Sequence, residues 1–523
     1  LPHLRPHPPP PSQGEAPKVK AQTGKRFASG EITRIMSDWV TSNLDADSQI
    51  TRDAGRTRAR ARALRRDNPY FRRFLAELAA NVIGAEGIRL KMRVKRANVG
   101  RYANKPDEDT SRMIEAAWAD FSGRGKFDAT RQFSRAQWSR LALQSIATAG
   151  EAGIRLVRGF PKNDFRFAVQ GVEADHLDLD FNREPSRGIP RIRASVEVDR
   201  YGEPTAYHLL DRHPGRNQHH WEEDGGRTRL LAEGYRDISS DRTADSFLFP
   251  FMAEEFGQTR GISWATAAIG QLRQLGEYEQ AAVVAARVGS SKMFFIKQSE
   301  TAPTSEDEEE WEDGSTVMEV SPGGGHVLGP GQDLASWDPN DPNGNYPDFR
   351  KGILRGIAAG LLCNYNILAN DLEGVNYSSI RQGVLSEREL WSLIQVWWID
   401  AVEAPIFRAW LEMAILSGEL PLNMSEFKRY CCPEFEGRRW DWVDPQKDIR
   451  ASREAIQAGL SSTQREARKR GVDIGRIAEE QREDAALAAG ADDQIELGFA
   501  SEFLPGADPV PEVPEEPKKP GDE

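Results

Sequence analysis

The sequence has few cysteines and no long apolar run, and each shortage excludes a class of protein. Its three cysteines are Cys363 and the adjacent pair Cys431 and Cys432, which can build neither a disulfide framework nor a zinc site and indicate a reducing compartment. Leu390–Ile399, the longest uncharged apolar run near the aromatic-rich region, is far shorter than the ~18 to 20 residues that span a bilayer. We therefore expect no membrane contact. The sequence does not begin with a basic region followed by an apolar one, so we also expect no secretory signal.

The motifs of common phosphate-binding and hydrolytic sites are incomplete. A nucleotide-binding loop reads G-x-x-x-x-G-K-[ST], but Gly125-Lys126 is followed by Phe127. A serine-hydrolase turn reads G-x-S-x-G, but Gly261-Ile262-Ser263-Trp264 continues with Ala265. We therefore expect no catalytic residue, no cofactor and no metal site, and an ATP-driven step would need another protein.

The best enzymatic alternative rests on a group of acidic residues. Asp175, His176, Asp178 and Asp180 are close in the sequence. On a strand, Asp178 and Asp180 would share one face and could hold a divalent ion for phosphodiester hydrolysis. The lysine and further carboxylates of a two-metal nuclease do not follow them in the expected relation. A metal-dependent DNA-processing enzyme that uses Asp178 and Asp180 stays open beside the simpler interpretation of a solvated strand edge.

Histidines gather in one polar stretch. Residues 212–245 contain His213, His219 and His220. No carboxylate or cysteine stands at a convincing ligand spacing from them, so the stretch is more typical of an exposed loop than of a metal site.

Charge is abundant and unevenly distributed. The 523 residues are 39% hydrophobic and 29% charged, which is typical of a globular protein of about three to five structural units. The net charge is -12, yet residues 52–101 hold 15 Lys or Arg against four acids, and residues 483–523 hold 12 acids against two Lys. Glu306–Asp313 is acidic at every position except Trp311. Such runs predict exposed loops and tails, or a surface that a polyanion passes without being held.

Hydrophobic spacing predicts helices early in the chain and strands after them. Helical patterns cover residues 30–85, 107–121 and 134–149. Asn68-Pro69 predicts a cap and a first-turn proline, and Ser134 predicts another cap. A period of two over residues 153–210 predicts strands, with a hairpin turn at Asp199–Gly202.

The longest helical pattern spans residues 263–288 and has one apolar face, so we expect it to pack by that face only. Its polar positions include Gln271, Gln274, Glu277 and Gln280. A loop dense in turn-forming residues follows at 335–347, and a long polar loop inside a folded chain is more often functional than accidental. The polar side chains of that loop are Asp338, Asn340, Asp341, Asn343 and Asn345.

The last third of the chain reads as helical with polar ends. Residues 380–417 contain Trp391, Trp397, Trp398 and Trp410 among Leu and Ile, which predicts a core helix pair. Asp444-Pro445 and a capping box at Thr463–Glu466 predict the starts of two further helices. The composition of residues 1–25 and of the acidic stretch beyond Leu487 predicts flexible or disordered segments.

Six segments suit no catalytic site. They are LRRDNPYFRRFLAELAANVIGAEGIRL from Leu64, GEAGIRLVR from Gly150, EVDRYGEPTAYHL from Glu197, EFGQTRGIS from Glu255, LRGIAAGLLCNYNILANDLEGVNYSS from Leu354 and QAGLSSTQREARKRGVD from Gln457. Together they resemble the portal proteins of lambda-like tailed phages, and EFGQTRGIS is similar to the family's Gly-Gln-x-Arg-Gly start of a long helix. Each segment alone is a weak signal, but they keep their order over most of residues 50–485.

The resemblance implies an α+β multidomain portal fold that assembles as a ring, expected to be a dodecamer. The parts of that fold are an α/β wing, a helical stem, a small α/β clip and a helical crown. The implied divisions are a disordered Pro-rich arm (1–25), wing (26–257), stem helix (258–288), clip and second stem portion (289–334), channel loop (335–347), a long helix with the rest of the wing (348–440), crown (441–489) and a disordered acidic tail (490–523).

The resemblance also implies a function. The ring would stand at one capsid vertex of the virion, after assembly in the host cytoplasm, and double-stranded DNA would be packaged and ejected through it. Implied partners are further copies of the chain, the DNA, a terminase large subunit as motor, a head-completion or neck protein and the major capsid protein. Channel residues would be the loop and stem positions named above, and the motor would dock at Glu308, Glu309, Glu310 and Trp311. We expect the basic helix Arg56–Arg73 to face away from the narrowest bore.

One further alternative is a structural adaptor that joins capsid to tail. In that case, no DNA would pass through it. A ring whose bore is too narrow for a duplex would favour this alternative.

Overall fold

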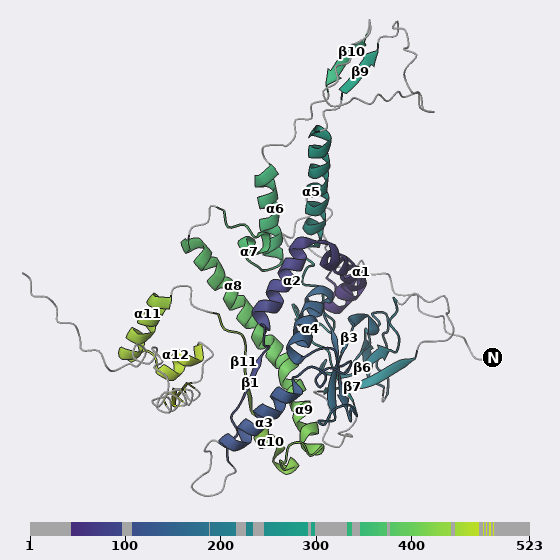
Figure 1. Ribbon diagram of the computed structural model, residues 1–523. Coiled ribbons are helices and arrows are strands. Elements are labelled where there is room, and N and C mark those ends of the chain that lie inside the picture. Colours follow the sequence, from purple (N-terminus) through teal and green to yellow (C-terminus); the bar gives the residue numbers. More distant parts are fainter. Residues whose placement is uncertain are drawn as a thin grey trace, which may run out of the picture. The chain divides into compact units, whose positions relative to one another are not determined.

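The computed structural model describes most of the chain as a mixed helix and sheet fold (Figure 1). The described residues are 43–96, 107–187, 189–215, 226–233, 245–290, 294–298, 332–336, 346–373, 377–440, 445–469, 474, 477–478, 481–482 and 485. The chain divides into two units, Leu1–Asp45 and Ala46–Glu523. Every helix and strand named below belongs to the second unit.

The first helical pattern is two helices, α1 (Ala46–Asp67) and α2 (Pro69–Val82). Asn68 separates them, because its side chain accepts a hydrogen bond from the Phe71 N–H at 3.0 Å while Pro69 takes the first helical position. The expected cap and first-turn proline are confirmed. The part of the pattern before residue 43 lies outside the described residues.

Helices α3 (Glu108–Phe121) and α4 (Arg135–Ala149) also begin where the sequence predicts. Asp107 caps α3 by accepting from the Thr110 N–H, and Ser134 forms a reciprocal capping box with Gln137 at the start of α4. Both α1 and α2 pack against α4.

A seven-stranded sheet follows, in the order β3-β2-β8-β7-β6-β5-β4. Neighbouring strands are antiparallel except for β7 and β8. The turn at Asp199–Gly202 joins β5 to β6, so the expected hairpin is confirmed. The strands are β2 (Gly153–Arg158), β3 (Phe167–Val172), β4 (Arg191–Arg193), β5 (Val196–Val198), β6 (Pro204–Leu210), β7 (Arg227–Ala232) and β8 (Ser246–Leu248).

The Trp-rich region supplies core helices, as expected. Helix α8 (Tyr377–Trp398) continues through a π-helical turn, Ile399–Glu403, into α9 (Ala404–Leu416), which packs against β2 and β3. Trp391, Trp398 and Trp410 are buried, and Trp397 is partly buried against the same core. Trp410 lies edge-on to Trp118 of α3, with ring centroids 4.9 Å apart.

The long one-faced helix is α5 (Ile269–Ser290), and the expected start at residue 263 is wrong. The Trp264 N–H donates to the Ala147 carbonyl of α4 at 3.1 Å, so this stretch is bonded to another helix before α5 begins. Helix α6 (Tyr346–Gly360) packs against α5 and is followed by α7 (Tyr365–Ala369). Between α5 and α6 in the sequence, β9 (Phe294–Gln298) and β10 (Gln332–Ser336) pair antiparallel.

The remaining described elements are short. Strands β1 (Arg89–Met92) and β11 (Pro433–Glu436) pair antiparallel, and α10 (Phe427–Tyr430), α11 (Pro445–Gln457) and α12 (Thr463–Lys469) complete the set. The cap of α12 is Ser462, whose hydroxyl accepts from the Arg465 N–H at 3.2 Å, so the predicted cap at Thr463 is wrong by one residue. Of the helices described, none is long and apolar enough to cross a membrane.

Candidate functional site

Helix α5 has a buried apolar face and an exposed polar one. Leu272 and Leu275 are fully buried, whereas the four polar positions expected at a channel wall are exposed: Gln271, Gln274, Glu277 and Gln280. Each residue of an α-helix turns by ~100°, so side chains three residues apart differ in direction by ~60°. The four side chains therefore spread over about half of the circumference instead of forming one line.

Gln271 differs from the other three. A Cβ added at Gly356 of α6 would lie 3.0 Å from the Gln271 Oε1, so Gln271 lies against α6. Glu277 accepts from the Arg273 Nε at 2.8 Å, but both side chains stay more than half exposed. The positions that face freely outward are thus Gln274, Glu277 and Gln280.

A polar triad joins α5 to α2 and α6. The Tyr70 hydroxyl of α2 donates to the Glu279 Oε1 of α5 at 2.7 Å and accepts from Arg350 of α6 at 2.8 Å. Arg350 also donates to Glu279 at 2.8 Å, and this bond, with the one to Tyr70, raises the pKa of the guanidinium. Burial and the bond to Glu279 raise the pKa of Tyr70. The triad therefore holds α5 against two other helices.

Helices α5 and α6 are also packed together by aromatic rings. Tyr278 of α5 stacks on Tyr346 with ring centroids 5.7 Å apart and meets Phe349 edge-on at 5.1 Å. Phe349 is still about half exposed, as are Val283 and Val284 further along α5. The outer half of this helix pair thus presents apolar side chains that a single chain leaves uncovered.

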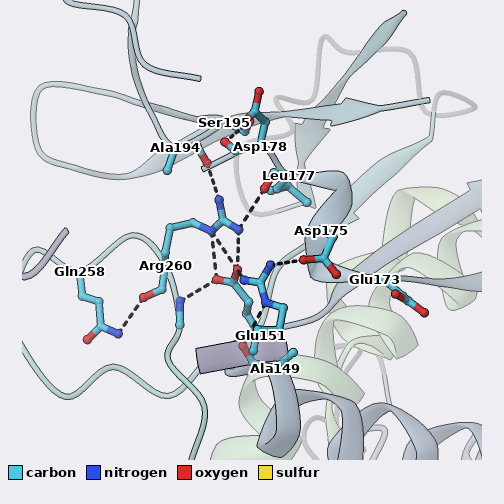
Figure 2. A network of polar contacts seen from close by, with 12 residues as sticks. Ala149, Glu151, Glu173, Asp175, Leu177, Asp178, Ala194, Ser195, Gln258 and Arg260 are labelled. Carbon is cyan, nitrogen blue, oxygen red and sulfur yellow. Dashed lines mark hydrogen bonds and ion pairs between the residues drawn. The ribbon is translucent and has the colours of Figure 1, made fainter. Parts of the chain in front are cut away.

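The segment that leads into α5 is anchored by a buried ion network (Figure 2). Arg260 donates through Nε to both carboxylate oxygens of Glu151, at 3.1 and 3.0 Å, and the Gly261 N–H donates to the same carboxylate at 2.6 Å. Arg58 of α1 donates to Glu151 at 2.6 Å and to Asp175 at 2.7 Å. Arg260, Arg58 and Glu151 are buried, so each charge depends on the others for compensation.

Further contacts extend this network to the sheet. Arg260 donates to the carbonyls of Ala194 at 2.7 Å and Leu177 at 3.2 Å. Burial alone would raise the pKa of the Asp175 carboxyl, but the charges of Arg58 and Arg62 and their hydrogen bonds outweigh it, so the pKa is lowered. The network therefore ties the lead-in of α5 to α1, the end of α4 and the loops beside the sheet.

Two glycines allow the segment before α5 to lie this close to the end of α4. A Cβ at Gly261 would lie 2.2 Å from the Gly150 carbonyl oxygen, and a Cβ at Gly150 would lie 2.4 Å from the Ile262 backbone. Gly150 also has φ of +93°, the left-handed conformation that ends α4. Both belong to segments that resemble the portal family, GEAGIRLVR and EFGQTRGIS, which the fold brings into contact.

A second buried carboxylate lies in the Trp-rich core and was not predicted from the sequence. Glu403, in the π-helical turn, accepts from Arg135 at 3.0 Å and from the Trp398 indole at 3.1 Å. Arg135 also donates to the Ile88 carbonyl at 2.6 Å. Both carboxylate oxygens of Glu403 accept hydrogen bonds, so this residue stabilises the junction of α8, α9 and α4.

The proposed metal pair Asp178 and Asp180 is not on a strand, so that prediction is wrong. A 3₁₀ turn, Ala174–His176, follows β3, and Asp178 and Asp180 lie in the loop after it. Asp178 is ion-paired with Arg227 at 2.5 Å and accepts from the Asp180 N–H at 3.0 Å. Its carboxylate is thus compensated by a guanidinium, not arranged with Asp180 around a shared ion.

The fold does bring carboxylates to His213, which its sequence spacing did not predict. The His213 Nε2 lies 3.1 Å from Glu173 and 3.4 Å from Asp175. Arg62 is ion-paired with both of these carboxylates. A guanidinium therefore already compensates the two acids that a metal would use. His219 and His220 lie outside the described residues.

The basic helix predicted at Arg56–Arg73 is the end of α1 and the start of α2. Arg58 is only 2% exposed, whereas Arg56, Arg60, Arg66, Arg72 and Arg73 are exposed. The helix is thus mixed: Arg58 is part of the core, Arg62 and Arg65 are partly buried, and the other arginines are exposed.

Two predicted sites lie outside the described residues. They are the loop residues Asp338, Asn340, Asp341, Asn343 and Asn345, and the acidic block residues Glu308, Glu309, Glu310 and Trp311. Of the range 335–347, Ala335 and Ser336 belong to β10, and Tyr346 begins α6.

All three cysteines are free, in agreement with the absence of a disulfide framework. Burial, with a smaller contribution from the charge of Glu387, raises the pKa of the Cys363 thiol to about 12. Burial also raises the pKa of Cys431 and of Cys432. None of these thiols is activated as a nucleophile.

Comparisons with known proteins agree with the segments quoted above. Residues 33–395 match the family described as phage portal protein, lambda family. The chain is 32% identical over 472 residues to a probable portal protein of Halomonas phage phiHAP-1, covering 88% of this chain and 87% of that relative. It is 25% identical to a portal protein of Escherichia phage N15 (88% and 89% covered) and 24% identical to portal protein B of Escherichia phage lambda (84% and 85% covered).

Among solved structures, the chain is similar to a chain from the neck of a native gene transfer agent particle computed with C12 symmetry. The two are 12% identical with a TM-score of 0.42, and the match covers 81% of this chain and 94% of the other.

Proposed function

The chain belongs to the lambda family of phage portal proteins, and on that premise we propose that its copies form a ring at one capsid vertex through which double-stranded DNA is packaged and ejected. The observation that carries this proposal is the asymmetry of α5. One face is buried in the core, and Gln274, Glu277 and Gln280 face outward. Repeated around an axis, such a helix lines a channel with polar side chains.

The chemistry of that lining suits a duplex in motion. Each Lys or Arg that binds a phosphate releases counterions and adds affinity, which movement must then break. Amide and carboxylate side chains add none of this affinity. On α5, the guanidinium of Arg273 is compensated by Glu277. A wall with Gln274, Glu277 and Gln280 therefore lets DNA slide.

The exposed apolar side chains support assembly from many copies. Val283 and Phe349 lie on the α5–α6 pair, and Leu393 and Val396 lie on α8, all between 52% and 67% exposed. Identical subunits that meet head to tail bury such surfaces and close into a ring. In this proposal, neighbouring copies cover these residues in a dodecamer.

We propose to divide the chain by the family's architecture. We assign residues 26–257 and 348–440 to the wing, 258–288 to the stem, 289–334 to the clip with a second stem portion and 441–489 to the crown. Residues 335–347 are assigned to a channel loop. The ion network of Arg58, Glu151 and Arg260 then fixes the stem to the wing.

The chain supplies no nucleotide-binding loop, so in this proposal a terminase large subunit hydrolyses ATP and docks at Glu308, Glu309, Glu310 and Trp311. A neck protein takes its place after packaging, and the major capsid protein holds the ring in the virion. Assembly takes place in the host cytoplasm. The portal itself is a passive conduit without catalysis.

Adding positive charge to the channel wall tests the proposal. In the variant Gln274→Lys, Glu277→Lys, Gln280→Lys, four positive charges per copy are added, and DNA packaged per particle should fall about tenfold or more because each lysine holds phosphate. Rings should still form, since the three positions are exposed. The control Glu203→Lys, Glu419→Lys adds the same charge at exposed positions outside α5 and should package normally.

Normal packaging by the triple-lysine variant would contradict the channel assignment. It would favour the alternative of a head-tail adaptor through which no DNA passes. Imaging of the variant rings separates a failure of assembly from a failure of transport.

A further inference from the structure

A surface groove beside α1, α2 and α4 combines arginines with an apolar pocket. Its basic part is a cleft of about 660 Å³ lined by Arg62, Arg65, Arg66, Arg72, Gln144 and Glu173, with Leu75 and Ala76 on its floor. Its apolar part is a pocket of about 320 Å³ whose lining includes Trp138, Leu141, Ala142, Gly171 and Val172. The two parts share Arg62, Arg65 and Glu173, so they are continuous; we call them together the arginine groove.

Three of the arginines have no carboxylate partner in the part of the chain that the structure describes. Arg62 is ion-paired with Glu173 and Asp175, whereas Arg65 donates only to the Gln144 amide oxygen, at 3.3 Å. Arg66 and Arg72 are exposed and form no ion pair there. Burial and the charge of Arg62 lower the pKa of Arg65, which shows that its positive charge is poorly compensated.

The groove is built by fixed elements. Gln144 of α4 donates to the Leu75 carbonyl of α2 at 3.2 Å while accepting from Arg65 of α1, so one side chain positions three helices. The far wall is β3, which lies at the edge of the seven-stranded sheet. Leu141 is 41% exposed in the pocket although it is a large apolar side chain. Uncompensated guanidinium groups beside an uncovered apolar pocket indicate a ligand with carboxylates next to apolar side chains.

We propose that the arginine groove binds the chain's own acidic segment, residues 490–523, with carboxylates on Arg65, Arg66 and Arg72 and apolar side chains in the pocket. This segment carries ten Asp or Glu against two Lys, and it intersperses them with apolar residues. Asp492, Asp493 and Glu496 flank Ile495, and Leu497 and Phe499 follow. Arginine forms bidentate hydrogen bonds with carboxylates, which makes the match chemically specific.

Other anionic ligands fit less well. A DNA duplex is a stiff cylinder that offers phosphates but no apolar side chain for the pocket. The block Glu306–Asp313 offers only one apolar side chain, Trp311, among seven acids, so it has little to place in the apolar pocket. A segment that carries both kinds of side chain uses both halves of the groove.

Photo-crosslinking in the full-length chain tests this proposal, which does not depend on the portal function. With a benzoylphenylalanine at position 499, we expect crosslinks to the pocket lining around Leu141 and Val172. The variant Arg66→Glu, Arg72→Glu should lower the yield about tenfold, because two charge-assisted contacts become repulsive. The control Arg56→Glu, Arg60→Glu changes two exposed arginines of α1 outside the groove and should leave the yield unchanged.

A second variant tests the pocket separately. Gly171 lies in β3, where a Cβ would stand 3.6 Å from the Trp138 Nε1, so Gly171→Val fits the strand and fills the pocket. It should also lower the crosslink yield. The size of the crosslinked product shows whether the segment comes from the same copy or from a neighbour.

Three results would overturn the proposal. They are crosslinks that lie elsewhere, a yield that the groove variants do not change, and groove crosslinks from a probe at position 311 but not from position 499. Loss of duplex binding in the Arg66→Glu, Arg72→Glu variant, with the crosslink intact, would assign the groove to nucleic acid instead.

Discussion

Replacing Glu151 by Gln should strongly destabilise the protein although the two side chains have nearly the same shape. The Glu151 carboxylate receives hydrogen bonds from Arg58, Arg260 and the Gly261 N–H, and its side chain is fully buried. Glutamine retains one acceptor oxygen and directs an NH₂ group at donors. Arg58 would keep Asp175, but Arg260 would retain only two backbone carbonyls.

The magnitude follows from the loss of one partner in a buried ion pair, which costs about 3–5 kcal/mol because the remaining charge stays buried. That is a large part of the roughly 5–15 kcal/mol by which a domain is stable. The assay is urea unfolding of the full chain followed by tryptophan fluorescence. The control Glu277→Gln breaks the exposed pair with Arg273 on α5 and should cost less than about 1 kcal/mol.

A double-mutant cycle makes the test specific to the pair. If Arg260 and Glu151 compensate each other, Arg260→Gln combined with Glu151→Gln should be less destabilising than the sum of the single changes, by about 1–3 kcal/mol. Additive effects, or a loss below about 1 kcal/mol for Glu151→Gln alone, would refute the interpretation that this network anchors α5.

Three further predictions follow from the described contacts. Gly261→Ala places a Cβ 2.2 Å from the Gly150 carbonyl oxygen and should lower the urea midpoint of unfolding markedly. The control Gly270→Ala, which lies in open space on α5, should raise the free energy of unfolding by roughly 0.5–1 kcal/mol. Equal effects of the two substitutions would contradict the close approach of Gly261 and Gly150. The pKa of Asp175 is lowered in the folded state, so its contribution is present above the unfolded pKa of about 3.9 and is lost as the pH falls below it. Asp175→Asn should therefore be less stable than the parent at pH 7 but approach it at about pH 3 in urea unfolding, and a gap that persists at low pH would refute this. Asp178→Asn with Asp180→Asn should leave ring assembly and DNA packaging unchanged, and a packaging defect in intact rings would revive the metal-dependent alternative.

Local signals in the sequence predicted much of the fold. Asn68, Asp107 and Ser134 cap their helices through side-chain contacts to N–H groups three residues away, and such contacts depend on little else. The Asp199–Gly202 hairpin and the buried Trp398 and Trp410 follow from equally local patterns.

Long-range contacts account for what the sequence did not predict. Helix α5 begins at Ile269 because the segment before it forms a backbone hydrogen bond with α4. The hydrophobic spacing of residues 263–268 cannot predict that long-range hydrogen bond. Arg58 belongs to a run of basic residues that is typical of an exposed surface. It nevertheless lies in the core, where it donates a hydrogen bond to Glu151, 93 residues away. Their spacing would put Asp178 and Asp180 on one face of a strand, whereas the chain forms a 3₁₀ turn and a loop there.

The candidate channel wall was predicted only in part. The spacing identified Gln274, Glu277 and Gln280 as polar positions of a one-faced helix, and they are exposed. It could not show that Gln271 lies against α6, because that depends on how two helices pack. The sequence segments that resemble the portal family contained Glu151 and Arg260, but their pairing emerged only in the fold.

Electron cryo-microscopy of the purified full-length chain tests the central claim most directly. We expect a closed ring whose open bore admits a DNA duplex, with Gln274, Glu277 and Gln280 of every copy on the bore surface and Val283 covered by a neighbouring copy. A monomer or dimer, or a ring in which those polar side chains face away from the bore, would contradict it.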